Sequence, residues 1–237
     1  MERLDKLLAG TGCWSRKEVK DLVRQGRVRV DGVTAAKPED KVEPTMDIRV
    51  DGQQVCCGGF TYIMLNKPQG LLSATEDRRQ ATVLDLLDAP LRKQELFPVG
   101  RLDKDTTGLL VLTNDGQLAH RLLAPKSHVD KVYLATVDVP VVEADVKAFA
   151  EGITLGDGTQ CQSAGLQPLE DGLRCLVTLR EGKFHQVKRM LAHQGKTVLE
   201  LERLSMGSLH LDQQLGRGEW RHLTPEEVDL LRRSVSG

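Results

Sequence analysis

Gly100-Arg101-Leu102-Asp103-Lys104-Asp105-Thr106-Thr107-Gly108-Leu109-Leu110-Val111-Leu112 joins a charged loop to an uninterrupted apolar run. Pro98 and Gly100 indicate a turn before the loop, and Asn114-Asp115-Gly116 indicates another after the run, which is therefore predicted to be a buried strand. Loops that project from a rigid scaffold often carry functional side chains. Asp103 and Asp105 are the acids of this loop, and their spacing alone favours ordinary solvated turn residues.

The remainder of the C-terminal part mixes strands and helices without a regular alternation. Strands are predicted at residues 62–65, 131–137, 173–179, 198–204 and 208–211, and helices at residues 82–87, 117–123, 143–151, 184–193 and 225–233. Thr224-Pro225-Glu226-Glu227 supplies an N-cap, a proline at the first position and a glutamate at the third position of the last helix. Together with the buried strand at residues 109–112, the strands outnumber the helices, which predicts an α+β sheet rather than a doubly wound one.

The N-terminal segment has the pattern of a small basic helical unit. Residues 1–30 hold eight Lys/Arg and four Asp/Glu. Apolar residues at helical spacing within 4–8 predict a first helix, and Ser15-Arg16-Lys17-Glu18 has the form of a capping box that starts a second. Alternation over Arg27-Val28-Arg29-Val30 leads into the turn pair Asp31-Gly32, which predicts a β-hairpin with its arginines facing solvent.

Composition excludes several classes of protein. The net charge of −1 argues against a uniformly basic nucleic-acid binder, and the charged N-terminus together with the lack of a long apolar run predicts a cytoplasmic protein without membrane contact. The five cysteines form no C-x-x-C pair and the six histidines no H-x-x-x-H pattern, so no metal site and no cofactor are expected. Residues 52–60 contain three glycines and no charge, which indicates a linker.

The basic segment resembles the S4 domain, an RNA-binding module, through Arg3–Leu8, Ser15-Arg16 and Val28–Gly32. The resemblance implies an S4-like domain over residues 1–57, a linker at about 52–60 and a catalytic domain over residues 60–237. Cations on such a unit bind phosphates, with salt-sensitive affinity and little base readout. The RNA-binding face is expected to consist of Arg3, Lys6, Ser15, Arg16, Lys17, Lys20, Arg24, Arg27 and Arg29.

The larger domain resembles the pseudouridine synthases that modify ribosomal RNA. Four stretches carry the resemblance in order: Met64–Gly70, Gly100–Asp103 with Thr106–Leu109, Lys131–Tyr133, and Glu181–Met190. The resemblance implies a small α/β S4 domain followed by a mixed, mainly antiparallel catalytic sheet. It also implies an isomerisation in which the C1′–N1 bond of a uridine breaks and the uracil rejoins the ribose through C5.

The resemblance also assigns roles to residues. Asp103 would be the nucleophile, Tyr133 would stack on the base and assist proton transfer, and Lys188 would form an ion pair with Asp103 that keeps it ionised. Relatives commonly place arginine at position 188; lysine retains the charge without the bidentate fork. The expected substrate-binding residues are Arg101, Lys67, Lys131, Lys183, His185, Gln186 and Arg189. Which atom Asp103 attacks stays open.

The expected substrate is 16S rRNA within a small-subunit assembly particle, at the uridine-516-type site, and the expected protein is a monomer. Three alternatives remain at this point. The same reaction on a 23S rRNA site shares all of the motifs. A non-catalytic rRNA-binding or assembly factor would be marked by loss of Asp103 or Tyr133, and both are present. A hydrolytic glycosidase would need a second acid paired with Asp103, and none is evident.

Overall fold

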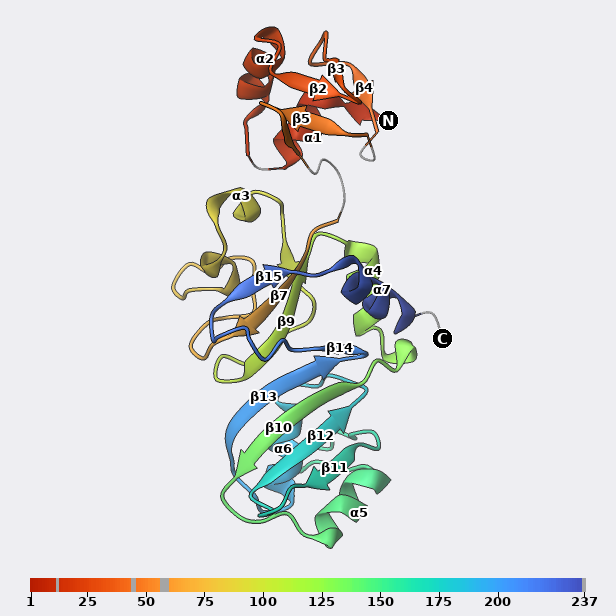
Figure 1. Cartoon of the computed structure of the whole chain (residues 1–237). Coiled ribbons are helices and arrows are strands. Elements are labelled where there is room, and N and C mark those ends of the chain that lie inside the picture. The colour runs from red at the N-terminus through yellow and green to blue at the C-terminus, as the bar shows by residue number, and fades with distance from the viewer. Residues whose placement is uncertain (12, 44–45, 56–59, 236–237) are drawn as a thin grey trace. The chain divides into compact units, whose positions relative to one another are not determined.

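The structure is a computed structural model that describes the 237-residue chain except residues 12, 44–45, 56–59 and 236–237 (Figure 1). The chain divides into two compact units, Met1–Thr61 with Leu87–Leu96, and Tyr62–Leu86 with Phe97–Gly237. The first unit thus includes a ten-residue segment that the sequence places in the catalytic domain. Residues 56–59 of the predicted linker lie outside the described residues, and the domain boundary stays a prediction.

The first unit is built from short strands and two amphipathic helices. Its helices are α1 (Leu4–Gly10), α2 (Arg16–Arg24) and α3 (Ala89–Arg92). Strands β2 (Val28–Val30), β3 (Val33–Thr34), β5 (Ile48–Val50) and β6 (Gln53–Gln54) form an antiparallel sheet in the order β3-β2-β5-β6, and β1 (Glu2–Arg3) pairs with β4 (Lys41–Val42). The apolar side chains of α1 and α2 pack with those of β2 and β5 in one core.

Two local predictions for this unit are confirmed. The Ser15 hydroxyl accepts the N–H of Glu18, and the Glu18 carboxylate accepts the N–H of Ser15, so both donors at the start of α2 are satisfied. The β2–β3 turn has positive φ at both central residues, Asp31 (49°) and Gly32 (80°). Such a turn matches the twist of the hairpin strands, and Asp-Gly tolerates it.

The second unit is organised by a nine-stranded sheet with the order β11-β12-β10-β13-β9-β7-β15, in which β14 pairs with β13 and β8 with β9. Strands β9 and β13 run parallel, and the other described pairs are antiparallel, which confirms the mixed, mainly antiparallel sheet. The strands are β7 (Tyr62–Lys67), β8 (Phe97–Pro98), β9 (Thr107–Thr113), β10 (Lys131–Val137), β11 (Gly165–Pro168), β12 (Arg174–Leu179), β13 (Val198–Met206), β14 (Leu209–His210) and β15 (Trp220–His222).

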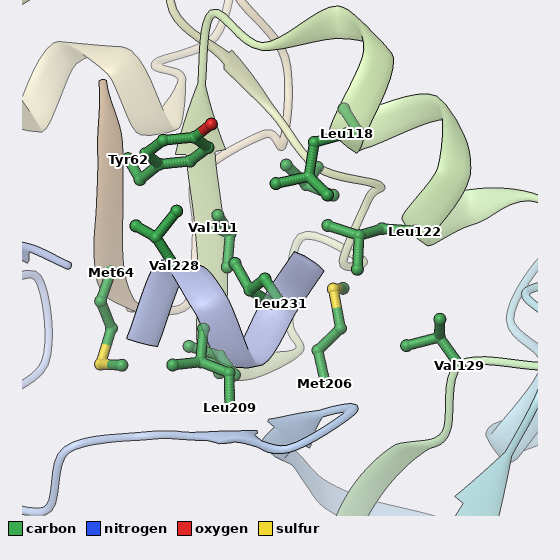
Figure 2. Packing of buried hydrophobic residues seen from close by; sticks show 13 residues of the cluster. Tyr62, Met64, Val111, Leu118, Leu122, Val129, Met206, Leu209, Val228 and Leu231 are labelled. Carbon is green, nitrogen blue, oxygen red and sulfur yellow. The ribbon is translucent and has the colours of Figure 1, made fainter. Parts of the chain in front are cut away.

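Helices complete this unit: the 3-10 helices η1 (Val83–Leu86) and η2 (Pro125–Ser127), and the α-helices α4 (Gly116–Leu123), α5 (Glu143–Glu151), α6 (Gln186–His193) and α7 (Pro225–Arg233). Figure 2 shows side chains of α4 and α7 packing with those of β7 and β9 around Tyr62, Val111 and Leu231. The Tyr62 hydroxyl donates to Asp115, and Asp115 also caps α4. Side chains of β9 belong to this core, and β9 directly follows the charged loop of residues 100–106 that contains Asp103, called the Asp103 loop below.

Several element boundaries differ from the sequence-based expectations. The helix expected from residue 184 begins at Gln186, because His185 adopts a left-handed backbone conformation (φ 48°) that cannot belong to an α-helix. Strand β15 has no clear sequence signal; it forms because Trp220 lies opposite Leu65 of β7, a partner that only the tertiary structure supplies.

Gly108→Ala is expected to destabilise the second unit strongly. Gly108 has φ 96°, and a Cβ there would lie 2.3 Å from the Arg203 carbonyl oxygen on the parallel strand β13. Strain and steric overlap together should lower the free energy of unfolding by about 3 kcal/mol or more, measured by urea denaturation. Gly158→Ala is the matched control, since Gly158 also has positive φ (83°) but no atom within 4 Å of a Cβ. Equal effects of both variants would contradict the packing argument.

Candidate active site

The Asp103 loop is clamped through its backbone from two sides. Lys67, the last residue of β7, is fully buried, and its ammonium lies 2.9–3.3 Å from the carbonyl oxygens of Pro68, Asp103, Lys104 and Thr106. The Ser73 hydroxyl accepts the N–H of Leu102 (3.1 Å) and donates to its carbonyl (2.9 Å). These contacts hold the main chain on both sides of Asp103 and leave its carboxylate to face outward.

Burial shapes the chemistry of Lys67. Desolvation lowers the pKa of its ammonium to about 8, although the carboxylates of Asp105 and Asp103 oppose this shift. At neutral pH the group is therefore mainly protonated and donates to the loop carbonyls. All of these donors are directed at the backbone of the protein, so Lys67 is placed to hold the loop, and its contact with substrate stays a prediction.

Asp103 lies at a pocket of about 80 Å³ that Tyr133 also lines. Tyr133 is nearly buried on β10, where it pairs with Val177 on β12 and Arg203 on β13. Strand β13 lies between β9 and β10, so the loop before β9 and the middle of β10 face the same pocket. The other residues around it are Arg101, Leu102, Thr106, Leu179, Gly182, Lys183, His185, Gln186, Val187 and Leu201.

Two groups on or beside α6 approach the Asp103 carboxylate. Lys188 Nζ lies 3.4 Å from one oxygen of Asp103, and His185 Nε2 lies 3.4 Å from the other. Lys188 makes a shorter ion pair, 2.5 Å, with Asp105, and this hydrogen bond lowers the pKa of the Asp105 carboxyl. Lys188 is thus a cation shared by two acids. The sequence alone assigned no role to Asp105; its position two residues after Asp103 was the available signal.

The other expected substrate contacts separate into accessible and buried groups. Arg101 is exposed at the pocket and forms no ion pair with any described residue. Lys183 lines the pocket, pairs with Glu181 at 3.0 Å and donates to the Gln160 carbonyl. Arg189 pairs with Asp157 at 2.5 Å.

Two of the expected substrate-binding side chains, Gln186 and Lys131, are buried. The Gln186 amide donates to Glu181 (2.6 Å) and accepts the N–H of Lys183 (3.0 Å), so this side chain closes the turn before α6. Lys131 is 6% exposed, its ammonium donates to the Val129 carbonyl, and burial lowers its pKa. Both side chains have hydrogen-bond partners inside the protein, and Gln186 also lines the pocket, so their contact with substrate stays a prediction.

The basic face of the first unit is partly neutralised. Arg3, Lys6, Arg24 and Arg27 form ion pairs with the acids Asp5, Glu2, Asp21 and Asp51, respectively. The Ser15 hydroxyl caps α2 by accepting an N–H of the helix, and its contact with RNA stays a prediction. The cations of the expected face that form no ion pair with any described residue are Arg16, Lys17, Lys20 and Arg29. Three of these lie on α2.

Comparison with known proteins gives the class that this fold and site define. A model of the RNA pseudouridylate synthase family matches residues 61–193, and a model of the S4 domain matches residues 2–48. The chain belongs to the RNA pseudouridylate synthase family, whose members are isomerases, and it carries an N-terminal S4 domain.

Relatives match along nearly the whole chain. An uncharacterized RNA pseudouridine synthase of Bacillus subtilis is 48% identical, with 97% of this chain and 98% of the relative covered. Ribosomal small subunit pseudouridine synthase A is 41% identical in Yersinia pestis (95% and 96% covered) and 39% identical in Escherichia coli K12 (95% and 98% covered). A crystal structure of a pseudouridylate synthase is similar with a TM-score of 0.69 and 37% identity, covering 98% of this chain and all of that one.

Among the residues that the structure describes, no helix has the length and apolar character needed to cross a membrane.

Proposed function

We propose that this protein converts one uridine of small-subunit ribosomal RNA to pseudouridine, at the uridine-516-type site. The observation that carries the proposal is the Asp103 carboxylate, held at a pocket beside Tyr133 and flanked by Lys188 and His185. The small-subunit assignment is supported by the relatives from Yersinia pestis and Escherichia coli, which carry that substrate in their names.

The proposed chemistry is an isomerisation without an external reactant. The C1′–N1 bond breaks, a C1′–C5 bond forms, C5 loses a proton and N1 gains one. An ionised carboxylate beside the sugar is what such a step requires, and the Lys188 ammonium and the His185 imidazole each lie 3.4 Å from an oxygen of Asp103. Tyr133 offers an aromatic ring to the uracil and a hydroxyl to the proton that leaves C5.

The target uridine must be extruded from its stack, which costs a few kcal/mol. Phosphate contacts made away from the pocket can offset this cost. Arg101, exposed at the pocket and without an ion pair to any described residue, is the cation best placed to hold the extruded nucleotide or its phosphate.

Pseudouridine mapping on both ribosomal RNAs tests this function. RNA from a strain lacking the protein should have lost one pseudouridine, in 16S rRNA, and the purified protein should restore it. Supplying free 16S rRNA and an immature small-subunit particle in parallel distinguishes the two substrate forms. We expect the protein to modify the particle. A lost site in 23S rRNA would refute the small-subunit assignment, and no lost site in either RNA would refute the proposed function.

Neutralising α2 should weaken RNA binding. The triple variant Arg16→Gln, Lys17→Gln, Lys20→Gln removes three cations that form no ion pair with any described residue. We expect affinity to fall at least about tenfold and the salt dependence of log K to become shallower by about one for each phosphate that is no longer bound. The control Arg24→Gln, Arg27→Gln removes arginines already paired with Asp21 and Asp51, and should change both quantities less. An unchanged salt slope in the triple variant would contradict this role of α2.

A further inference from the structure

An exposed aromatic ring lies beside the pocket and has no part in the chemistry described above. Phe184 is 74% exposed, in the turn between β12 and α6. Its ring stacks on the imidazole of His185, with centroids 3.8 Å apart and planes inclined by 18°. Since His185 Nε2 lies 3.4 Å from the Asp103 carboxylate, the Phe184 ring stacks on a side chain that itself contacts the reacting group.

The turn holds these two rings in place. His185 has a left-handed backbone conformation, so the chain reverses direction immediately before α6. The Gln186 amide closes the turn by accepting the N–H of Lys183, and Arg189 lies 3.4 Å from the Phe184 carbonyl. The ring is therefore presented by a hydrogen-bonded turn and not by a free loop end.

A single exposed apolar residue is common in proteins and needs no explanation by itself. Phe184 differs from the others described in the second unit, because Leu123, Val139, Val142, Leu173 and Leu199 are all aliphatic. It is also continuous with the pocket through His185. Two cations are close to it: Lys183 precedes it in the chain, and Arg189 donates to its carbonyl oxygen. An aromatic face beside cations is the combination that binds single-stranded nucleic acid, with bases stacking on the ring and phosphates meeting the charges.

We propose that the exposed face of Phe184 stacks on the nucleobase directly adjoining the target uridine. This inference rests on the proposed function and adds a second recognition element to it. When the uridine leaves its stack to reach Asp103, its neighbour loses a stacking partner. The Phe184 ring replaces that partner, with His185 stacked behind it, and so stabilises the extruded state. Because stacking tolerates any base, Phe184 contributes to affinity more than to sequence readout.

Single-turnover kinetics on an RNA fragment spanning the modified uridine test the proposal. Phe184→Ala should raise the half-saturating concentration about tenfold, whereas Phe184→Tyr, which retains a stacking ring, should stay near wild type. Val142→Ala is the matched control, since Val142 is an exposed apolar side chain (54%) at the start of α5 and does not line the pocket. Circular dichroism should show that each variant is folded, as expected for surface positions.

Abasic substitution on either side of the target supplies the decisive comparison. For the wild-type protein, removing the base at one adjoining position should weaken binding about tenfold. The Phe184→Ala protein should bind this abasic RNA nearly as well as it binds the fragment with all of its bases. Equal losses in the two proteins, or no effect of Phe184→Ala, would overturn the stacking role. A purely structural role, acting through His185, would lower the saturated rate without dependence on the neighbouring base. Absence of product from wild-type protein on intact RNA would instead refute the proposed function itself.

Discussion

Asp103→Asn is expected to abolish pseudouridine formation and to leave RNA binding intact. The amide cannot act as a nucleophile or carry the negative charge that the reaction requires, so the rate should fall by about four orders of magnitude or more. The loop should keep its shape, because Lys67 and Ser73 hold its main chain and not the Asp103 carboxylate. Tritium release from uracil-C5-labelled RNA measures the rate, and filter binding measures the affinity.

Asp105→Asn is the matched control for this prediction. Asp105 lies in the same loop and forms the shorter ion pair with Lys188, but its side chain is 70% exposed and does not line the pocket. The variant should retain a measurable rate. Normal modification by Asp103→Asn would refute the catalytic assignment, and equal inactivity of both variants would show that the acids act as a pair.

Lys67→Met should inactivate the enzyme through the backbone of the loop. The buried ammonium is a hydrogen-bond donor for the carbonyl oxygens of Asp103, Lys104 and Thr106, and methionine fills similar volume without a donor. Each buried carbonyl left unsatisfied costs about 1–3 kcal/mol, so the loop should shift to find water. A displacement of about 1 Å at a reacting group can cost 10²-fold in rate, and we expect a loss of at least about this size.

Lys104→Met controls for loss of a lysine from the same loop. Lys104 is exposed, and its ammonium donates to Gln80 at the surface. This variant should keep nearly full activity and the same melting temperature as wild type. An active Lys67→Met protein would show that the clamp is dispensable and that other contacts, such as those of Ser73, suffice to position Asp103.

Because the pKa of Lys67 is lowered, the stability that this residue contributes should rise with pH, whereas the activity of the enzyme should fall. Its folded-state pKa of about 8 lies below the value of about 10.4 for an unfolded lysine, so between these values the unfolded chain binds more protons. The free energy of unfolding of wild type relative to Lys67→Met should therefore rise with pH across this window. Activity of wild type should fall above pH 8, because the neutral amine holds the loop carbonyls less tightly. A flat stability difference across the window would contradict the lowered pKa.

The sequence alone predicted most of the helices and strands of the larger domain and the three candidate catalytic residues. Hydrophobic patterning located β10 and α5 with their observed bounds, and the cap residues Thr224–Glu227 located the start of α7. Local chemistry located the Ser15 capping box and the Asp31-Gly32 turn, because both depend on residues within three positions of one another. Resemblance of short motifs singled out Asp103, Tyr133 and Lys188.

The tertiary structure decided what each polar side chain does. Lys67 and Lys131 are cations in the sequence, and only the sheet shows that both are buried and bound to carbonyl oxygens. Lys188 is shared with Asp105 because α6 faces the Asp103 loop, a relation between segments more than 80 residues apart. Burial and partners depend on such distant contacts, whereas periodicity and turn chemistry do not. For that reason the sequence could predict which residues belong to the site. It could not predict which of them react, which hold the loop backbone and which are exposed cations.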